Sequence, residues 1–188
     1  GVLRHLLFVP LPRWELVIIF VNHVPPTPTP TALAPVPEAT MKAHYVLNVM
    51  RYVAWPGESF PLPASRSLTL CVLGQDALGT VDALLALEGK RGSQVPQVSV
   101  LRAQGVRGLQ GCHAVFVAES DAHRMDHIIA TLGSLPVLVV TDAPVAAGAT
   151  VALAIDNRRM VFDIDLTRAR ASQLQVSSKL MQLARTTR

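Results

Sequence analysis

The sequence predicts an α/β fold: a single domain with a largely parallel sheet, helices on both faces of the sheet, and a C-terminal antiparallel hairpin followed by terminal helices. Two observations support this prediction. Short, continuous apolar segments alternate with helical patterns, which is typical of parallel strands that are buried on both faces. Half of the 188 residues are hydrophobic but only 5% are aromatic, a balance that favours an aliphatic layered core over an aromatic-rich sandwich.

The first part of the chain differs from the rest. We expect residues 1–37 to form an export segment or irregular leader with a proline-rich linker, and residues 38–188 to form the α/β domain. The run from Leu16 to Val21 is apolar but, at six residues, far shorter than the roughly 20 that span a bilayer. It fits the apolar part of a signal peptide instead. Six prolines between Val24 and Pro37 predict an extended linker.

The domain begins with a helical pattern that we expect to run from Thr40, as its cap, to Ala54, because Trp55-Pro56 disfavours further helix. The apolar segments predict strands, and the amphipathic segments between them predict helices. The expected strands are 68–73, 98–102, 114–118 and 135–140, and the expected helices between them are 76–87 and 121–132.

The C-terminal third predicts a different arrangement. Strands over 150–155 and 160–164 are separated by Asp156-Asn157-Arg158-Arg159, a turn-forming sequence that indicates an antiparallel hairpin. A helix is expected to begin at Leu166, with Asp165 as a candidate cap. A last helix is expected after Ser177, its cap, and carries Leu180, Met181, Leu183 and Ala184.

Charge narrows the classes of partner. The net charge is +4, and from Asn157 to the C-terminus seven basic residues face only two acidic ones. Such a segment suits an anionic surface or an acidic protein face. No zinc-finger, RNA-binding aromatic motif or P-loop accompanies the charge, so a nucleic-acid partner is disfavoured.

No set of residues predicts catalysis, a cofactor or a metal. Gly-x-Ser-x-Gly is absent, and Asp163 and Asp165 alone are weak support for a carboxylate pair. His123 and His127 have the spacing at which two imidazoles share a metal on a helix, but no third and fourth ligand accompanies them. Gly74 and Gly79 lack the neighbours of a phosphate-binding loop, so they predict a tight turn.

The two cysteines leave two possibilities. Cys71 lies within an expected strand and Cys112 directly before another. Neighbouring strands bring such residues within reach of a disulfide, but two reduced core thiols fit the pattern equally well, because the compartment decides.

From Thr40 to Ala184 the chain resembles the YfiR family of periplasmic regulators. The resemblance is carried by segments in a common order: Tyr52-Val53-Ala54-Trp55-Pro56, the two cysteine-containing strands, Val137 to Asp142, Phe162-Asp163-Ile164-Asp165, and Ser177-Ser178-Lys179-Leu180-Met181. The last two are similar to the Phe-Glu-Ile-Asn strand and the Ser-Ser-Lys-Leu-Leu signature of the family.

The resemblance implies a non-enzymatic protein of the periplasm, without a cofactor. It implies two partners: the periplasmic part of an inner-membrane diguanylate cyclase, which the protein would inhibit and so control cyclic di-GMP signalling and biofilm formation, and an outer-membrane lipoprotein that would release this inhibition. A homodimer is compatible with it. It also implies a disulfide between Cys71 and Cys112.

Two sets of contact residues are expected. The C-terminal segment, which combines the signature with positive charge, predicts the partner-binding surface at Leu174, Val176, Ser177, Ser178 and Lys179. An alternative function is a periplasmic receptor for a small nucleotide-like or aromatic ligand, with Arg158 and Arg159 of the hairpin as candidate ligand-binding residues.

Overall fold

The computed structural model describes residue 27 and residues 37–75, 79–88, 96–144 and 148–188. The expected leader and linker therefore lie almost wholly outside the described residues. Residues Val36–Arg188 form one compact unit.

Seven strands form the main sheet, in the order β3-β2-β4-β5-β6-β7-β9. The first five strands of this order are mutually parallel, β7 is antiparallel to β6, and β9 is parallel to β7. The expected largely parallel sheet with a C-terminal antiparallel hairpin is confirmed. The strands are β2 (Ser67–Leu73), β3 (Gln97–Arg102), β4 (Ala114–Val117), β5 (Leu138–Thr141), β6 (Val151–Asp156), β7 (Arg159–Ile164) and β9 (Thr186–Thr187).

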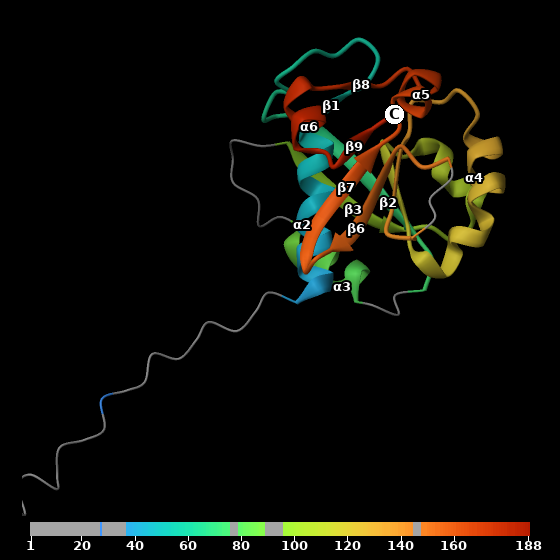
Figure 1. Cartoon of the computed structure of the whole chain (residues 1–188). Coiled ribbons are helices and arrows are strands. Elements are labelled where there is room, and N and C mark those ends of the chain that lie inside the picture. The colour runs from blue at the N-terminus through green and yellow to red at the C-terminus, as the bar shows by residue number, and fades with distance from the viewer. Residues whose placement is uncertain (1–26, 28–36, 76–78, 89–95, 145–147) are drawn as a thin grey trace, which may run out of the picture. The chain divides into compact units, whose positions relative to one another are not determined.

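Helices cover both faces of the sheet (Figure 1). On one face, α2 (Glu38–Arg51), α3 (Thr80–Leu87), α5 (Leu166–Ala171) and α6 (Ser178–Leu183) pack against alternate strand residues such as Leu70 and Phe116. On the other face, the 3₁₀ helix η1 (Val106–Gly111) and α4 (Met125–Leu132) pack against Cys71 and Val115. The central strands are buried on both faces, which explains their continuous apolar sequence.

The first helix differs from the expectation at both ends. α2 begins at Glu38 after Pro37, and no side chain caps it, so the prediction that Thr40 is the cap is wrong. The helix ends at Arg51, before Trp55-Pro56, because Val53–Ala54 form a short strand, β1, that pairs with β8 (Gln175–Val176). This pairing joins segments more than a hundred residues apart, and no local pattern predicts it.

The other expected elements form close to their predicted places, and residues 76–78 of the helix expected over 76–87 lie outside the described residues. The segment expected as one helix from Asp121 begins as a second 3₁₀ helix, η2 (Glu119–Arg124), and becomes α-helical only at Met125. Two of the three predicted caps are confirmed: Asp165 Oδ1 accepts from the backbone N–H of Arg168, and Ser177 Oγ accepts from that of Leu180.

Candidate functional site

The C-terminal segment expected to bind a partner is held against the end of α2. Val176 pairs with Val53 in the two-stranded sheet, and the Ser177 N–H donates to the Tyr52 carbonyl at 2.9 Å. Leu174 is buried in the core, and Ser177 is occupied as the cap of α6. Three of the five predicted contact residues therefore support the local structure, while Ser178 and Lys179 are exposed.

A groove of about 430 Å³ lies beside this segment, between α2, β7 and α6. Its floor is apolar and aromatic, with Tyr45 and Phe162 in an edge-on ring contact at a centroid distance of 6.3 Å. Leu183 of α6 also lines it and is 62% exposed. The lining residues are Tyr45, Asn48, Val49, Arg51, Tyr52, Met160, Val161, Phe162, Leu180, Leu183 and Arg185.

Two cationic side chains lie near the ring of Tyr52, which lines one wall of this groove. The Lys179 ammonium lies 5.4 Å from the centroid of the Tyr52 ring, and the Arg51 guanidinium lies 5.8 Å from it. The two cations thus flank one aromatic ring, an attraction that orients both side chains. The groove combines apolar surface with positive charge, and both features recur where proteins bind partners.

Arg185, on another wall, is neutralised by neighbouring acids. Its Nη2 lies 2.6 Å from Asp163 Oδ2, and its Nη1 lies 3.7 Å from Asp156 Oδ2. The hydrogen bonds from Arg185, together with one from Thr186, lower the pKa of Asp163 although burial opposes the shift. Asp163 therefore serves as a fixed anion that fastens the C-terminal end of the chain to β7, while the Asp165 carboxylate accepts a hydrogen bond at the start of α5.

Arg158 and Arg159 lie at the tip of the β6–β7 hairpin and are exposed. Asp156 pairs with Arg159 in the ladder, so Asn157 and Arg158 form a two-residue loop. Both have positive φ, 50° and 63°, as the turn of a tight hairpin demands. Neither arginine lines the groove, whereas their neighbours Met160 and Val161 do.

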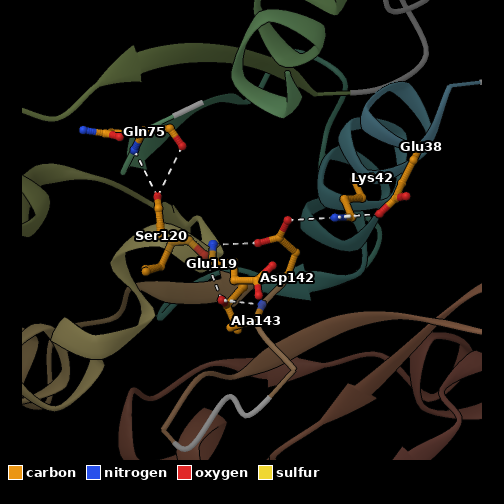
Figure 2. Close-up of polar contacts among 9 residues, drawn as sticks. Glu38, Lys42, Gln75, Glu119, Ser120, Asp142 and Ala143 are labelled. Carbon is orange, nitrogen blue, oxygen red and sulfur yellow. Dashed lines mark hydrogen bonds and ion pairs between the residues drawn. The ribbon is translucent and has the colours of Figure 1, made fainter. Parts of the chain in front are cut away.

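At the carboxyl ends of β2, β4 and β5 lies a polar network (Figure 2). The chain leaves β2 towards β3 on one side and returns to β4 on the other, and open α/β sheets bind ligands at such a point. Here Ser120 Oγ accepts from the Gln75 N–H at 3.2 Å and donates to the Gln75 carbonyl at 3.3 Å. These hydrogen bonds tie the two loops together.

The same network contains a buried ion pair. Lys42 Nζ lies 2.9 Å from Asp142 Oδ2 and 3.0 Å from Glu38 Oε1, and Asp142 Oδ1 accepts from the Glu119 N–H. Burial lowers the pKa of Lys42, but its hydrogen bonds and charge interactions with Asp142 and Glu38 more than offset this, so the pKa lies above its ordinary value. The Lys42 side chain thus connects α2 to the end of β5.

The two cysteines form a disulfide. Their Cα atoms are 6.0 Å apart, with Cys71 in β2 and Cys112 two residues before the adjacent β4. The bond lies on the face of the sheet that η1 and α4 cover.

The histidines with metal-like spacing are separated by a change of helix type. His123 lies in η2 and His127 in α4, and both are exposed. Over the described ranges, no three His, Cys, Asp or Glu side chains are grouped as they would be around a metal ion. No helix in this part of the chain has the length and apolar content needed to cross a membrane.

Sequence reasoning missed the groove and the lysine pair. Tyr45 and Phe162 are 117 positions apart, and Lys42 and Asp142 are 100 apart, so no local motif joins them. One signal was present in the sequence. Lys42 directly precedes Ala43 and interrupts the apolar face of α2. A lysine is rarely buried at such a place unless it is paired with an anion.

The model of the YfiR/HmsC-like family matches residues 39–185. No curated protein matches the chain.

Two solved structures show a similar fold. A conserved domain protein from Vibrio cholerae has a TM-score of 0.57 at 12% identity, with 82% of this chain and 62% of that chain covered. The ABC domain in complex with L-Trp from Streptococcus pneumoniae has a TM-score of 0.51 at 8% identity, with 80% and 62% covered. The chain thus spans less than two thirds of either structure.

Proposed function

Since this chain belongs to the YfiR/HmsC-like family, we propose that it is a periplasmic repressor that binds the periplasmic part of an inner-membrane diguanylate cyclase and inhibits it. By limiting cyclic di-GMP synthesis, it would control biofilm formation. The family match over residues 39–185 is the observation that carries the proposal. Repression would act through contact and not through a reaction of its own.

The groove between α2, β7 and α6 supports this proposal as the contact surface. It places Leu183, 62% exposed, beside the cations that flank Tyr52. An apolar centre with a charged rim is the usual composition of a specific interface, and the positive rim would attract an acidic face of the cyclase. Ser178 and Lys179 would lie at the edge of this surface. The other three residues, Leu174, Val176 and Ser177, would support the local structure beneath it.

The proposal is tested by mixing the chain with the purified periplasmic domain of the cyclase and measuring binding by calorimetry. Leu183→Ala should weaken binding, because Leu183 is 62% exposed in the free chain and would be buried at the centre of the proposed interface. Leu101→Ala is the matched control, since Leu101 is 54% exposed on β3, at the opposite edge of the sheet from β9.

Inhibition itself requires the full-length cyclase in liposomes. Added repressor should slow cyclic di-GMP formation, and the outer-membrane lipoprotein should restore it by sequestering the repressor. Equal binding by the Leu183 and Leu101 variants would move the interface away from the groove. Binding without any effect on the cyclase rate would refute repression.

A second candidate function is a periplasmic receptor for a small aromatic ligand. The volume of the groove, about 430 Å³, lies within the range of small-molecule sites. A ligand that raises the melting temperature of the chain, while the cyclase domain does not bind, would favour this alternative. Arg158 and Arg159 would contribute only if the ligand extends from the groove towards the hairpin tip.

A further inference from the structure

A second cavity, of about 280 Å³, opens at the amino ends of β4 and β5, beside the disulfide. It shares no lining residue with the groove between α2, β7 and α6. Three of its lining residues can carry a charge: Glu58, Arg66 and His113. The walls that η1 and the segment before β5 contribute are uncharged.

Both ring nitrogens of His113 face hydrogen-bond donors. Nδ1 lies 2.9 Å from the backbone nitrogen of Thr69, and Nε2 lies 3.1 Å from Arg66 Nη2. Arg66 also donates to Glu58 and to the Ser67 carbonyl, so the Thr69 N–H is the donor that depends on the ring. A neutral imidazole has one acceptor nitrogen, but an imidazolium has none. This position of the ring is therefore compatible only with neutral His113.

The Glu58 carboxylate has the opposite shortage. Its Oε1 lies 2.7 Å from both Nε and Nη2 of Arg66. Its Oε2 is buried and has no hydrogen-bond partner within the part of the chain that the structure describes, a costly arrangement for a carboxylate oxygen. Glu58 and His113 are neighbours, because Arg66 Nη2 contacts both. An acceptor suited to an imidazolium thus lies beside the ring.

The backbone of His113 is held in place, so only its side chain is free to turn. The His113 N–H donates to the Thr69 carbonyl, and the His113 carbonyl accepts from the Leu138 N–H, both at 3.0 Å. The same carbonyl accepts from the Trp55 indole N–H at 3.0 Å. Side chains in a close-packed interior cannot turn without free space, and the cavity supplies it on the side of Glu58.

We propose that His113 is a pH-operated switch with two positions. The neutral ring accepts from the Thr69 N–H; the protonated ring turns into the cavity and donates to Glu58 Oε2, and the Thr69 N–H loses its acceptor. Burial and Arg66 lower the pKa of His113, while Glu58 acts in the opposite direction. The ring therefore changes position below its ordinary pKa of 6.5. This switch depends neither on the repressor function nor on the groove.

The test is a nuclear magnetic resonance titration of the full chain from neutral to mildly acid pH. As His113 becomes protonated, its ring protons should lose their contact with the Thr69 amide and gain one with the Glu58 side chain. The Thr69 amide should exchange with solvent at least about tenfold faster than in His113→Asn at the same pH. The asparagine side chain can still accept a hydrogen bond but cannot be protonated.

Glu58→Gln removes the anion that the protonated ring requires. This variant should lower the midpoint of the His113 titration by at least about 0.5 pH units. Asp82→Asn is the matched control, because Asp82 also pairs with an arginine, Arg102, but does not line the cavity; it should leave the midpoint unchanged.

The measurements on the unaltered chain decide the matter if Glu58→Gln does not fold. Continued protection of the Thr69 amide while His113 titrates would overturn the proposal. So would a protonated ring that makes no contact with Glu58, equal midpoints in the Glu58 and Asp82 variants, or unfolding of the whole chain before His113 is protonated.

Discussion

Lys42 and Asp142 form a buried ion pair, with Nζ 2.9 Å from Oδ2 and side-chain exposures of only 6% and 3%. The pair joins the first helix of the domain to the end of a central strand, 100 residues later. Neither charge could be buried at this place without the other.

Lys42→Met is therefore expected to destabilise the protein by about 3 kcal/mol, because it leaves the Asp142 carboxylate buried without its cation. Urea unfolding measures the change. Adding Asp142→Asn to the variant should recover much of the loss, since it removes the unpaired charge. Glu38→Gln, whose side chain is 55% exposed, should change stability by less than about 0.5 kcal/mol. Equal effects of Lys42→Met and Glu38→Gln would show that the buried pair is not formed.

The disulfide is expected to persist in exported protein. Thiol titration of unfolded, unreduced protein should find neither Cys71 nor Cys112 free. Reduction should lower the free energy of unfolding by up to about 4 kcal/mol, the chain-entropy estimate for a loop of 41 residues. Two titratable thiols in protein purified from the periplasm would contradict this expectation.

Reversing the charge of Lys179 should affect partner binding more than it affects the stability of the fold. Lys179→Glu removes an exposed contact with the Tyr52 ring, so the free energy of unfolding should fall by no more than about 1 kcal/mol. Affinity for the cyclase domain should fall, and its dependence on salt should weaken, because the charge would lie at the rim of the interface. Arg107→Glu, an exposed reversal on η1 of the opposite face, provides the control. If both variants bind as the unaltered protein does, the interface lies elsewhere.

The hairpin turn is expected to gain stability from glycine. Arg158 adopts a φ of 63°, which disfavours an L-residue with a Cβ but not glycine. Arg158→Gly should raise the free energy of unfolding by up to about 1 kcal/mol, measured in urea. Arg159→Gly should lower it instead, because Arg159 lies in strand β7, where glycine is unfavourable. Destabilisation by both variants would contradict the turn geometry.

The free energy of unfolding should decrease as the pH is lowered and His113 becomes protonated. Its pKa is lowered in the folded state by burial and by Arg66, so the unfolded chain binds a proton first as the pH decreases. The stability that this residue contributes is complete above its ordinary pKa of 6.5 and is lost as the pH falls through the lower folded value. His113→Asn should flatten this part of the profile. An unchanged slope in the His113 variant would refute the assignment.

Much of the fold could be predicted because its information is local. The strand around Cys71 and the strand from Ala114 are continuous apolar runs, since both of their faces are covered. The turn at Asn157-Arg158 and the caps Asp165 and Ser177 depend on residues a few positions away. Patterns of this range determine where strands, turns and helix ends form.

Local sequence patterns therefore specify the architecture, the cysteine-bearing strands and the family of the chain. Tertiary structure alone decided which side chains meet: Lys42 with Asp142, Tyr52 with Lys179, and Arg66 with His113. It also shortened the first helix, because pairing of Val53 with Val176 outweighed the local preference for helix. The physical reason is the same in each case: these contacts join positions tens to more than a hundred residues apart, and their energy exists only once the sheet has brought them together.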